Sequence, residues 1–69
     1  MLNPWGVTHA EARALEMLIQ YGVSKTAAYE MEISHTAFCS RLLKAKHRMG
    51  KRHTIQALVE WDRFIRPKQ

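Results

Sequence analysis

The 69-residue chain is poor in cysteine, proline and glycine, and these shortages narrow the choice of architecture. Its single cysteine excludes a disulfide within the chain, and the paired cysteine and histidine spacings of a structural zinc site are absent. There is no internal repeat and no low-complexity tract. A domain of this size buries only ~60% of its unfolded surface, so its core is marginal. Without a disulfide or a metal, close helix packing or a partner subunit must supply its stability.

Long hydrophobic runs and enzyme motifs are also missing. No apolar stretch approaches the ~20 residues of a membrane span, and the N-terminal MLNPWGVT lacks the basic flank and apolar core of a signal peptide. We therefore expect no membrane association and a cytoplasmic protein, in a bacterial nucleoid or in the host cytoplasm if the chain is phage-encoded. There is no glycine-rich phosphate loop, no G-x-S-x-G and no pair of catalytic carboxylates on one helix face. We expect no enzyme activity, no cofactor and no small-molecule effector.

Acidic residues are absent from the segment between Arg41 and His53, whereas basic residues are concentrated there. The net charge is +5, and the cations of this segment are Arg41, Lys44, Lys46, Arg48, Lys51 and Arg52. A basic block on one element is the electrostatic signature of a polyanion-binding surface. An ordinary solvated face is the alternative for any such run. The outward position predicted for this helix favours the polyanion.

Four helices are predicted, at about residues 8–21, 24–31, 34–49 and 54–65. No alternating run of β-branched or aromatic residues indicates a strand. Residues 1–7 form an N-terminal arm in which Trp5 is expected to pack on the domain, and residues 67–69 form a C-terminal tail. The sequence therefore predicts an all-α, compact four-helix domain over residues 8–66 that contains a helix-turn-helix.

Capping residues and apolar spacing support these helix boundaries. Thr8 and Glu11 have the spacing of a capping box, and Gly22, Gly50 and Pro67 are placed as helix terminators. The residues expected to act as the other N-caps are Ser24, Ser34 and Thr54. The apolar residues that share the inward faces of the four helices in turn are Ala12, Leu15, Leu18, Ile19 and Gly22; Ala27, Ala28 and Met31; Phe38, Leu42, Ala45 and Met49; and Ala57, Leu58, Trp61, Phe64 and Ile65.

The helix at 34–49 has the cross-section of a helix that enters the DNA major groove. Opposite its buried stripe lie Thr36, Ser40, Leu43 and His47, with Cys39 and Lys44 at the border and cations on both flanks. Short side chains allow close approach to base edges, and long cations reach phosphates. The residues predicted to read bases are Thr36, Cys39, Ser40, Leu43 and Lys44. The residues predicted to bind phosphate are Ser24, Lys25, Thr26, Arg41, Lys46, His47, Arg48, Lys51 and Arg52, the first three at the start of the second helix.

Two residues of this helix have other interpretations. Leu43 either contacts thymine methyl groups or is an ordinary exposed leucine. Cys39 is four residues after His35, but the further ligands that a metal requires are missing, so we expect no metal. Its position near cations also allows a redox-sensing role for Cys39, although a small residue that faces the groove is the simpler interpretation.

Five short motifs, taken in order, resemble the LuxR/GerE-type helix-turn-helix DNA-binding domain over nearly all of the chain. They are Thr8-His-Ala-Glu11 through Leu15, Gly22-Val-Ser24, Ile33-Ser34, Met49-Gly50, and Thr54 with Ala57. The segment from Gly22 to Ile33 is one residue shorter than the usual form, and its spacing is more similar to LysR-type units. Glu32 stands where many such turns have glycine, and Ala37 replaces a threonine.

The resemblance implies a four-helix domain in which Cys39, Ser40 and Leu43 touch bases and the fourth helix mediates dimerisation. On that helix Ile55 and Val59 lie outside the core arc, so they form either a small symmetric contact or an incidentally exposed pair.

The sequence therefore predicts a sequence-specific double-stranded DNA-binding transcription regulator, a small repressor that reads the major groove with residues 34–49. Its partners would be double-stranded DNA and a second copy bound through the helix at 54–65. Two alternatives stay open: a protein-binding adaptor that docks on RNA polymerase or a sigma subunit, and an excisionase-like architectural factor in recombination.

Overall fold

A computed structural model describes residues 3–66 of the chain, and all regular structure within this range is helical. The helices are α1 (His9–Tyr21), α2 (Ser24–Glu30), α3 (His35–Arg48) and α4 (Thr54–Ile65). The all-α prediction and the four predicted helices are therefore confirmed, with bounds that differ by a residue at several ends. The predicted stop at Pro67 lies outside the described residues.

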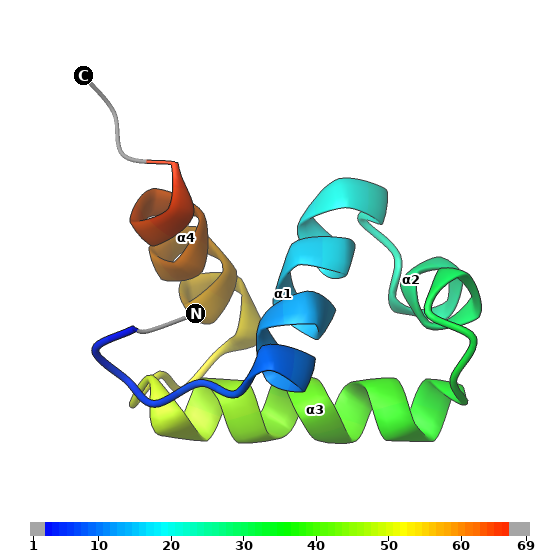
Figure 1. Cartoon of the computed structure of the whole chain (residues 1–69), viewed down its shortest axis with the longest axis horizontal. Coiled ribbons are helices and arrows are strands. Elements are labelled where there is room, and N and C mark those ends of the chain that lie inside the picture. The colour runs from blue at the N-terminus through cyan, green and yellow to red at the C-terminus, as the bar shows by residue number, and fades with distance from the viewer. Residues whose placement is uncertain (1–2, 67–69) are drawn as a thin grey trace.

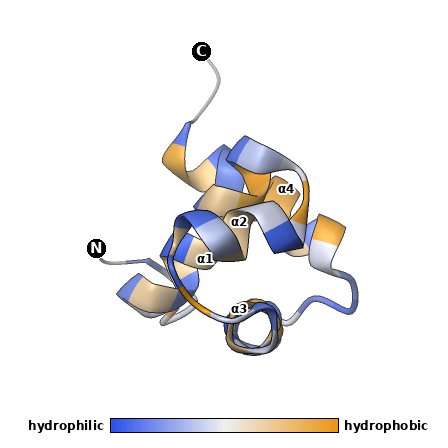
Figure 2. Cartoon of the chain, turned by 90° about the vertical axis from the view of Figure 1, so that its right-hand side faces the viewer, coloured by the Kyte–Doolittle hydropathy of each residue, from blue (hydrophilic) through white to orange (hydrophobic). Residues whose placement is uncertain are grey.

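The helices are arranged around α1 and α3, each of which packs against the other three. Figure 1 shows α3 along one edge of the molecule, with α1 standing on its middle, α2 at the end where α3 begins and α4 towards the end where α3 finishes. Viewed end-on in Figure 2, α3 lies at the margin of the molecule, and the other three helices lie to one side of it. One long face of α3 is therefore free of the rest of the fold.

The core is built from a few large side chains and many alanines. Leu15, Phe38 and Trp61 are the largest fully buried side chains. The alanines of the core, which allow helix backbones to approach closely, are Ala12, Ala14, Ala27, Ala28, Ala45 and Ala57. The predicted stripe of α3 is confirmed in full, because Phe38, Leu42, Ala45 and Met49 are all buried.

The predicted inward face of α1 is only partly correct. Ala12 and Leu15 are buried, Leu18 and Ile19 are half-buried and pack against the core, and Gly22 is exposed. Ala14 and Met17 are buried as well, although they lie outside the predicted face. The reason is that α1 contacts three helices, so more than one of its faces is covered.

Burial on α2 and α4 departs from the prediction at one residue. Met31, Leu58 and Ile65 are half-buried and pack against the core, whereas Phe64 is 37% exposed. Phe64 instead packs edge-on against Trp5, whose ring centroid is 5.4 Å away.

The N-terminal arm is fixed to α4 as expected. The Trp5 ring centroid lies 6.0 Å from that of Trp61. The arm is shaped by Asn3, whose Oδ1 accepts hydrogen bonds from the backbone N–H groups of Trp5 and Val7 at 3.1 and 2.9 Å. The Asn3 side-chain amide also donates to the Val7 carbonyl at 2.9 Å. Trp5 therefore packs against the core through Trp61 of α4.

Two of the four predicted N-caps are confirmed. Glu11 N donates to Thr8 Oγ1 at 3.2 Å while Thr8 N donates to Glu11 Oε1 at 3.1 Å, which completes the capping box. Ser34 Oγ accepts from Ala37 N at 3.1 Å. The chain leaves α1 and α3 through Gly22 and Gly50, whose φ values of 75° and 68° are those of helix-terminating glycines.

The other two predicted N-caps are wrong. Ser24 is the first residue of α2, and Val23 occupies the N-cap position without a side-chain hydrogen bond. The Ser24 hydroxyl is hydrogen-bonded to His35 Nε2 at 2.8 Å instead, so a tertiary partner has replaced the local one. Thr54 is likewise the first residue of α4, and at the N-cap position His53 donates its N–H to Gln56 Oε1 at 3.3 Å.

Candidate functional site

The free long face of α3 carries the residues that were predicted to read bases. Each of them is exposed, namely Thr36, Cys39, Ser40, Leu43 and Lys44. Leu43 is 49% exposed and His47 is also on the surface. The five side chains therefore form one outward strip that is small or polar except for a single leucine.

Most of the cations around α3 have no acidic partner. Of the residues that the structure describes, only Arg48, Arg63 and Arg66 form ion pairs, with Glu11, Glu60 and Asp62 respectively. The cations that remain unpaired within residues 3–66 on α3 and just after it are Arg41, Lys44, Lys46, Lys51 and Arg52. Arg41, Lys46 and Lys51 are half-buried, and long basic side chains of this kind typically cover apolar surface with their stems while the charged end reaches water.

Arg48 differs from the other cations of α3 because it is paired with an acidic residue of another helix. Its Nε donates to Glu11 Oε1 at 2.7 Å, and Glu11 is buried. The same Glu11 oxygen accepts from Thr8 N in the capping box. Arg48 therefore fastens the end of α3 to the start of α1, and with its side chain 45% exposed its assignment as a phosphate-binding residue stays a prediction. The two residues are 37 positions apart, and no local spacing links them.

The start of α2 lies beside the start of α3. Ser24 and His35 are joined by their hydrogen bond, and Lys25 and Thr26 next to them are exposed. Because its hydroxyl is already engaged, Ser24 contributes to this region mainly by holding the two helices together.

His35 also approaches Cys39, with Nε2 at 3.5 Å from Sγ. Both side chains are exposed. Within residues 3–66 no group of three histidine, cysteine, aspartate or glutamate side chains is placed to hold a metal ion. Along the same stretch, no helix has the length and apolar character needed to cross a membrane.

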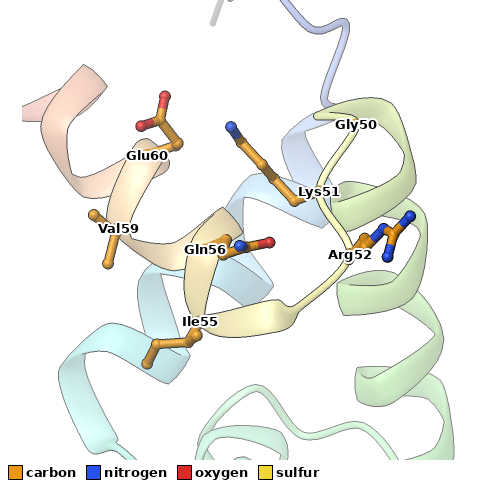
Figure 3. Close-up of a pocket in the computed structure, with 7 residues that line it drawn as sticks. All are labelled: Gly50, Lys51, Arg52, Ile55, Gln56, Val59 and Glu60. Carbon is orange, nitrogen blue, oxygen red and sulfur yellow. The ribbon is translucent and has the colours of Figure 1, made fainter.

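The residues predicted to mediate dimerisation lie on an exposed part of α4. Ile55 is 67% exposed and Val59 44%. They line an open hollow of about 500 Å³ between α4 and the segment that follows α3, and Figure 3 shows the side chains around it. Its other lining residues are Gly50, Lys51, Arg52, Gln56 and Glu60. The structure thus brings an apolar pair next to two unpaired cations.

Comparisons of the chain with protein-family models, with curated proteins and with solved structures find no significant match. The resemblance to LuxR/GerE-type domains therefore stays a prediction from the motifs alone. The case for a function depends on the geometry and charge described above.

Proposed function

We propose that the protein is a sequence-specific double-stranded DNA-binding regulator that inserts α3 into the major groove, with α2 and α3 acting as a helix-turn-helix. The observation that carries this proposal is the free face of α3. It combines an outward strip of small and polar side chains with unpaired cations and has no acidic residue between Ser34 and His53.

The shape of the molecule supports this choice of ligand. The major groove is about 12 Å wide and admits one α-helix. A helix that protrudes at the margin of a small domain can enter the groove without a clash from its neighbours, as the end-on view of α3 in Figure 2 illustrates. α3 has 14 residues and is therefore about 21 Å long, enough to span several base pairs.

The side chains divide into two roles. Thr36, Cys39, Ser40, Leu43 and Lys44 would contact base edges, where hydroxyl groups and a lysine recognise donors and acceptors and a leucine recognises thymine methyl groups. Arg41, Lys46, His47, Lys51 and Arg52 would contact phosphates on either side of the groove, and Lys25 and Thr26 would contact the backbone from the start of α2. Such contacts fix the register in which the strip meets the bases.

Repression is the simplest regulatory outcome for such a protein. Occupancy of a promoter by α3 is sufficient to block it, whereas activation requires a further surface that contacts polymerase. We therefore propose that the protein acts as a small repressor in the bacterial or phage-infected cytoplasm.

Selection of bound duplexes from a random DNA pool tests the proposal, with the intact chain at about 150 mM salt. We expect a defined sequence to be enriched, and Lys44→Ala to change the preferred base at one or two positions. The matched control is Arg13→Ala, which removes an exposed cation of α1 and should leave the enriched sequence unchanged. If no sequence is enriched, the proposal is wrong and the adaptor alternative is favoured. Enrichment together with strong bending of the duplex would favour the architectural alternative.

A further inference from the structure

The two ends of α3 carry surfaces of opposite charge, and the acidic one is unusual in a chain of net charge +5. Within residues 3–66, Glu30 and Glu32 are the acidic side chains that form neither an ion pair nor a hydrogen bond. Glu11, Glu60 and Asp62 are paired with arginines, and Glu16 accepts from Trp61 Nε1 at 3.2 Å. Two of the three carboxylates in this range that have no cationic partner are therefore at one place, and the third, Glu16, is half-buried beside the Trp61 indole.

That place also holds the most exposed large apolar side chain of the described residues. Tyr29, at 80% exposure, lies next to both acids, and the three residues line a hollow of about 500 Å³ together with Ile33. We call this set (Tyr29, Glu30, Glu32 and Ile33) the acidic end. Tyrosine is enriched at protein interfaces relative to the rest of the surface, so an exposed tyrosine that lines a hollow beside uncompensated charge is a candidate interaction surface.

The surface beyond the other end of α3 has the complementary character. Lys51, Arg52, Ile55 and Val59 line the hollow of Figure 3, and we call these four residues the basic end. Glu60 also lines this hollow, but it is paired with Arg63 at 3.6 Å. Both ends thus combine an exposed apolar group with charge, and the two charges are opposite in sign.

The two ends cannot meet within one molecule. The acidic end lies where α3 begins and the basic end follows the residue at which α3 stops, so α3 itself separates them, as Figure 1 shows. The length of α3, about 21 Å, is far beyond the reach of an ion pair.

We propose that two copies of this chain associate by unlike ends, the acidic end of one copy binding the basic end of the next. Tyr29 would pack on Ile55 and Val59 while Glu30 and Glu32 pair with Lys51 and Arg52. This contact differs from the symmetric Ile55–Val59 contact predicted from the sequence, because it joins two different surfaces and leaves one free surface of each kind for a further copy. It does not rest on the proposed function, but it would compete with DNA phosphate for two of the same cations. Lys51 and Arg52 are also proposed phosphate contacts, so association is measured without DNA.

Charge reversal at each end provides the test, by sedimentation velocity of the full chain at about 50 and 500 mM salt. We expect the wild-type chain to self-associate at low salt and to dissociate at high salt, because exposed charge pairs are screened. Glu30→Lys and Arg52→Glu should each weaken association by at least about tenfold, since each places like charges together. The control Arg13→Glu changes the net charge as Arg52→Glu does but lies outside both ends, and it should retain association.

Rescue makes the test specific. A chain that carries both Glu30→Lys and Arg52→Glu should self-associate again, because its two ends are once more opposite in charge. A 1:1 mixture of the two single variants should also associate. Circular dichroism checks that each variant is folded, which is expected because both substituted residues are exposed.

Three outcomes would overturn the proposal. The first is a wild-type chain that stays monomeric at low salt. The second is an Arg52→Glu variant that associates as well as or better than wild type while Glu30→Lys has no effect, which is the result expected for a symmetric contact between two basic ends. The third is a double variant that stays as dissociated as the single variants.

Discussion

Glu32 lies in the turn between α2 and α3 with a φ of 58°, the only positive value at a non-glycine residue in the range 3–66. A side chain in this left-handed region costs about 1 kcal/mol, because its Cβ approaches the following carbonyl. Glycine relieves the cost. We expect Glu32→Gly to raise the free energy of unfolding by about 0.5–1 kcal/mol, measured by urea denaturation.

Glu30→Gly is the matched control for that change. It removes the same charge from the same surface, but Glu30 is the last residue of α2 and has helical backbone geometry. Glycine in a helix costs up to about 1 kcal/mol, so this variant should be less stable than the wild type. If both variants changed the free energy of unfolding by the same amount, the lost charge, and not the backbone conformation, would determine the effect.

Glu11 is the buried acid of the fold, and its carboxylate joins two elements. It accepts from Thr8 N at 3.1 Å and from Arg48 Nε at 2.7 Å. We expect Glu11→Ala to lower the free energy of unfolding by about 2 kcal/mol, since a cap and a charged hydrogen bond are lost together. Glu11→Gln should lower the free energy of unfolding by less, because its amide oxygen can still accept the hydrogen bond from Thr8 N.

A comparison with Glu60 separates this effect from the loss of any surface ion pair. Glu60 Oε2 lies 3.6 Å from Nη1 of the exposed Arg63. Pairs of this kind contribute about 0–1 kcal/mol. Thermal or chemical denaturation of Glu60→Ala should therefore show a clearly smaller change than Glu11→Ala, and a larger one would contradict the role assigned to Glu11.

At the scale of elements, α3 is divided between residues that would identify bases and residues that would hold the backbone of the duplex. Lys44→Ala should lower affinity for the preferred site by about 1–3 kcal/mol and weaken discrimination at particular positions. Arg41→Gln should weaken binding to all duplexes by a similar factor, because phosphate contacts carry no sequence information. Titration of labelled duplexes with single base changes measures both, and an Arg41→Gln variant with altered base preference would show that the roles are wrongly assigned.

Elements with one buried face were predicted well from the sequence. The stripe of α3, from Phe38 to Met49, repeats at steps of four, three and four and is wholly buried. The caps at Thr8 and Ser34 were found for the same reason, since each is a contact between residues three apart. Periodicity and capping are local properties, so they can be read along the chain.

The errors occur where contacts distant in sequence decide the outcome. Ser24 was assigned as a cap because its hydroxyl could serve α2, but His35 of α3 takes that hydroxyl. Ala14 and Met17 are buried because α1 is covered on several faces, which no single-face pattern describes. The contact of Arg48 with Glu11 joins two different helices, so no local spacing indicates it.

For the candidate site, the sequence located the exposed strip of α3 and the basic segment after it, because a helical wheel distinguishes the face opposite a buried stripe. It did not show which cations are unpaired. That property depends on where the acids of other helices lie, as the pairs Glu11–Arg48 and Glu60–Arg63 illustrate.

At the scale of the whole molecule, the uneven distribution of charge predicts how DNA binding responds to salt. Arg41, Lys46, Lys51 and Arg52 are the unpaired arginines and lysines that are proposed to bind phosphate on α3 and after it. Each phosphate contact contributes about −0.9 to the slope of log affinity against log salt, so these four and Lys25 of α2, which is also proposed to contact the DNA backbone, give a slope of about −4.5 for one bound copy.

Fluorescence anisotropy between about 50 and 300 mM salt measures this slope. Arg41→Gln should reduce the magnitude of the slope by about 0.9, the contribution of one phosphate contact. Arg13→Gln, which removes an exposed cation of α1, should leave it unchanged. A slope near zero would contradict binding through the basic surface.

Both tryptophans of the chain belong to a single cluster, in which Trp5 of the arm and Trp61 of α4 lie against Phe64. Tryptophan fluorescence therefore reports whether the N-terminal arm and α4 are packed on the rest of the domain.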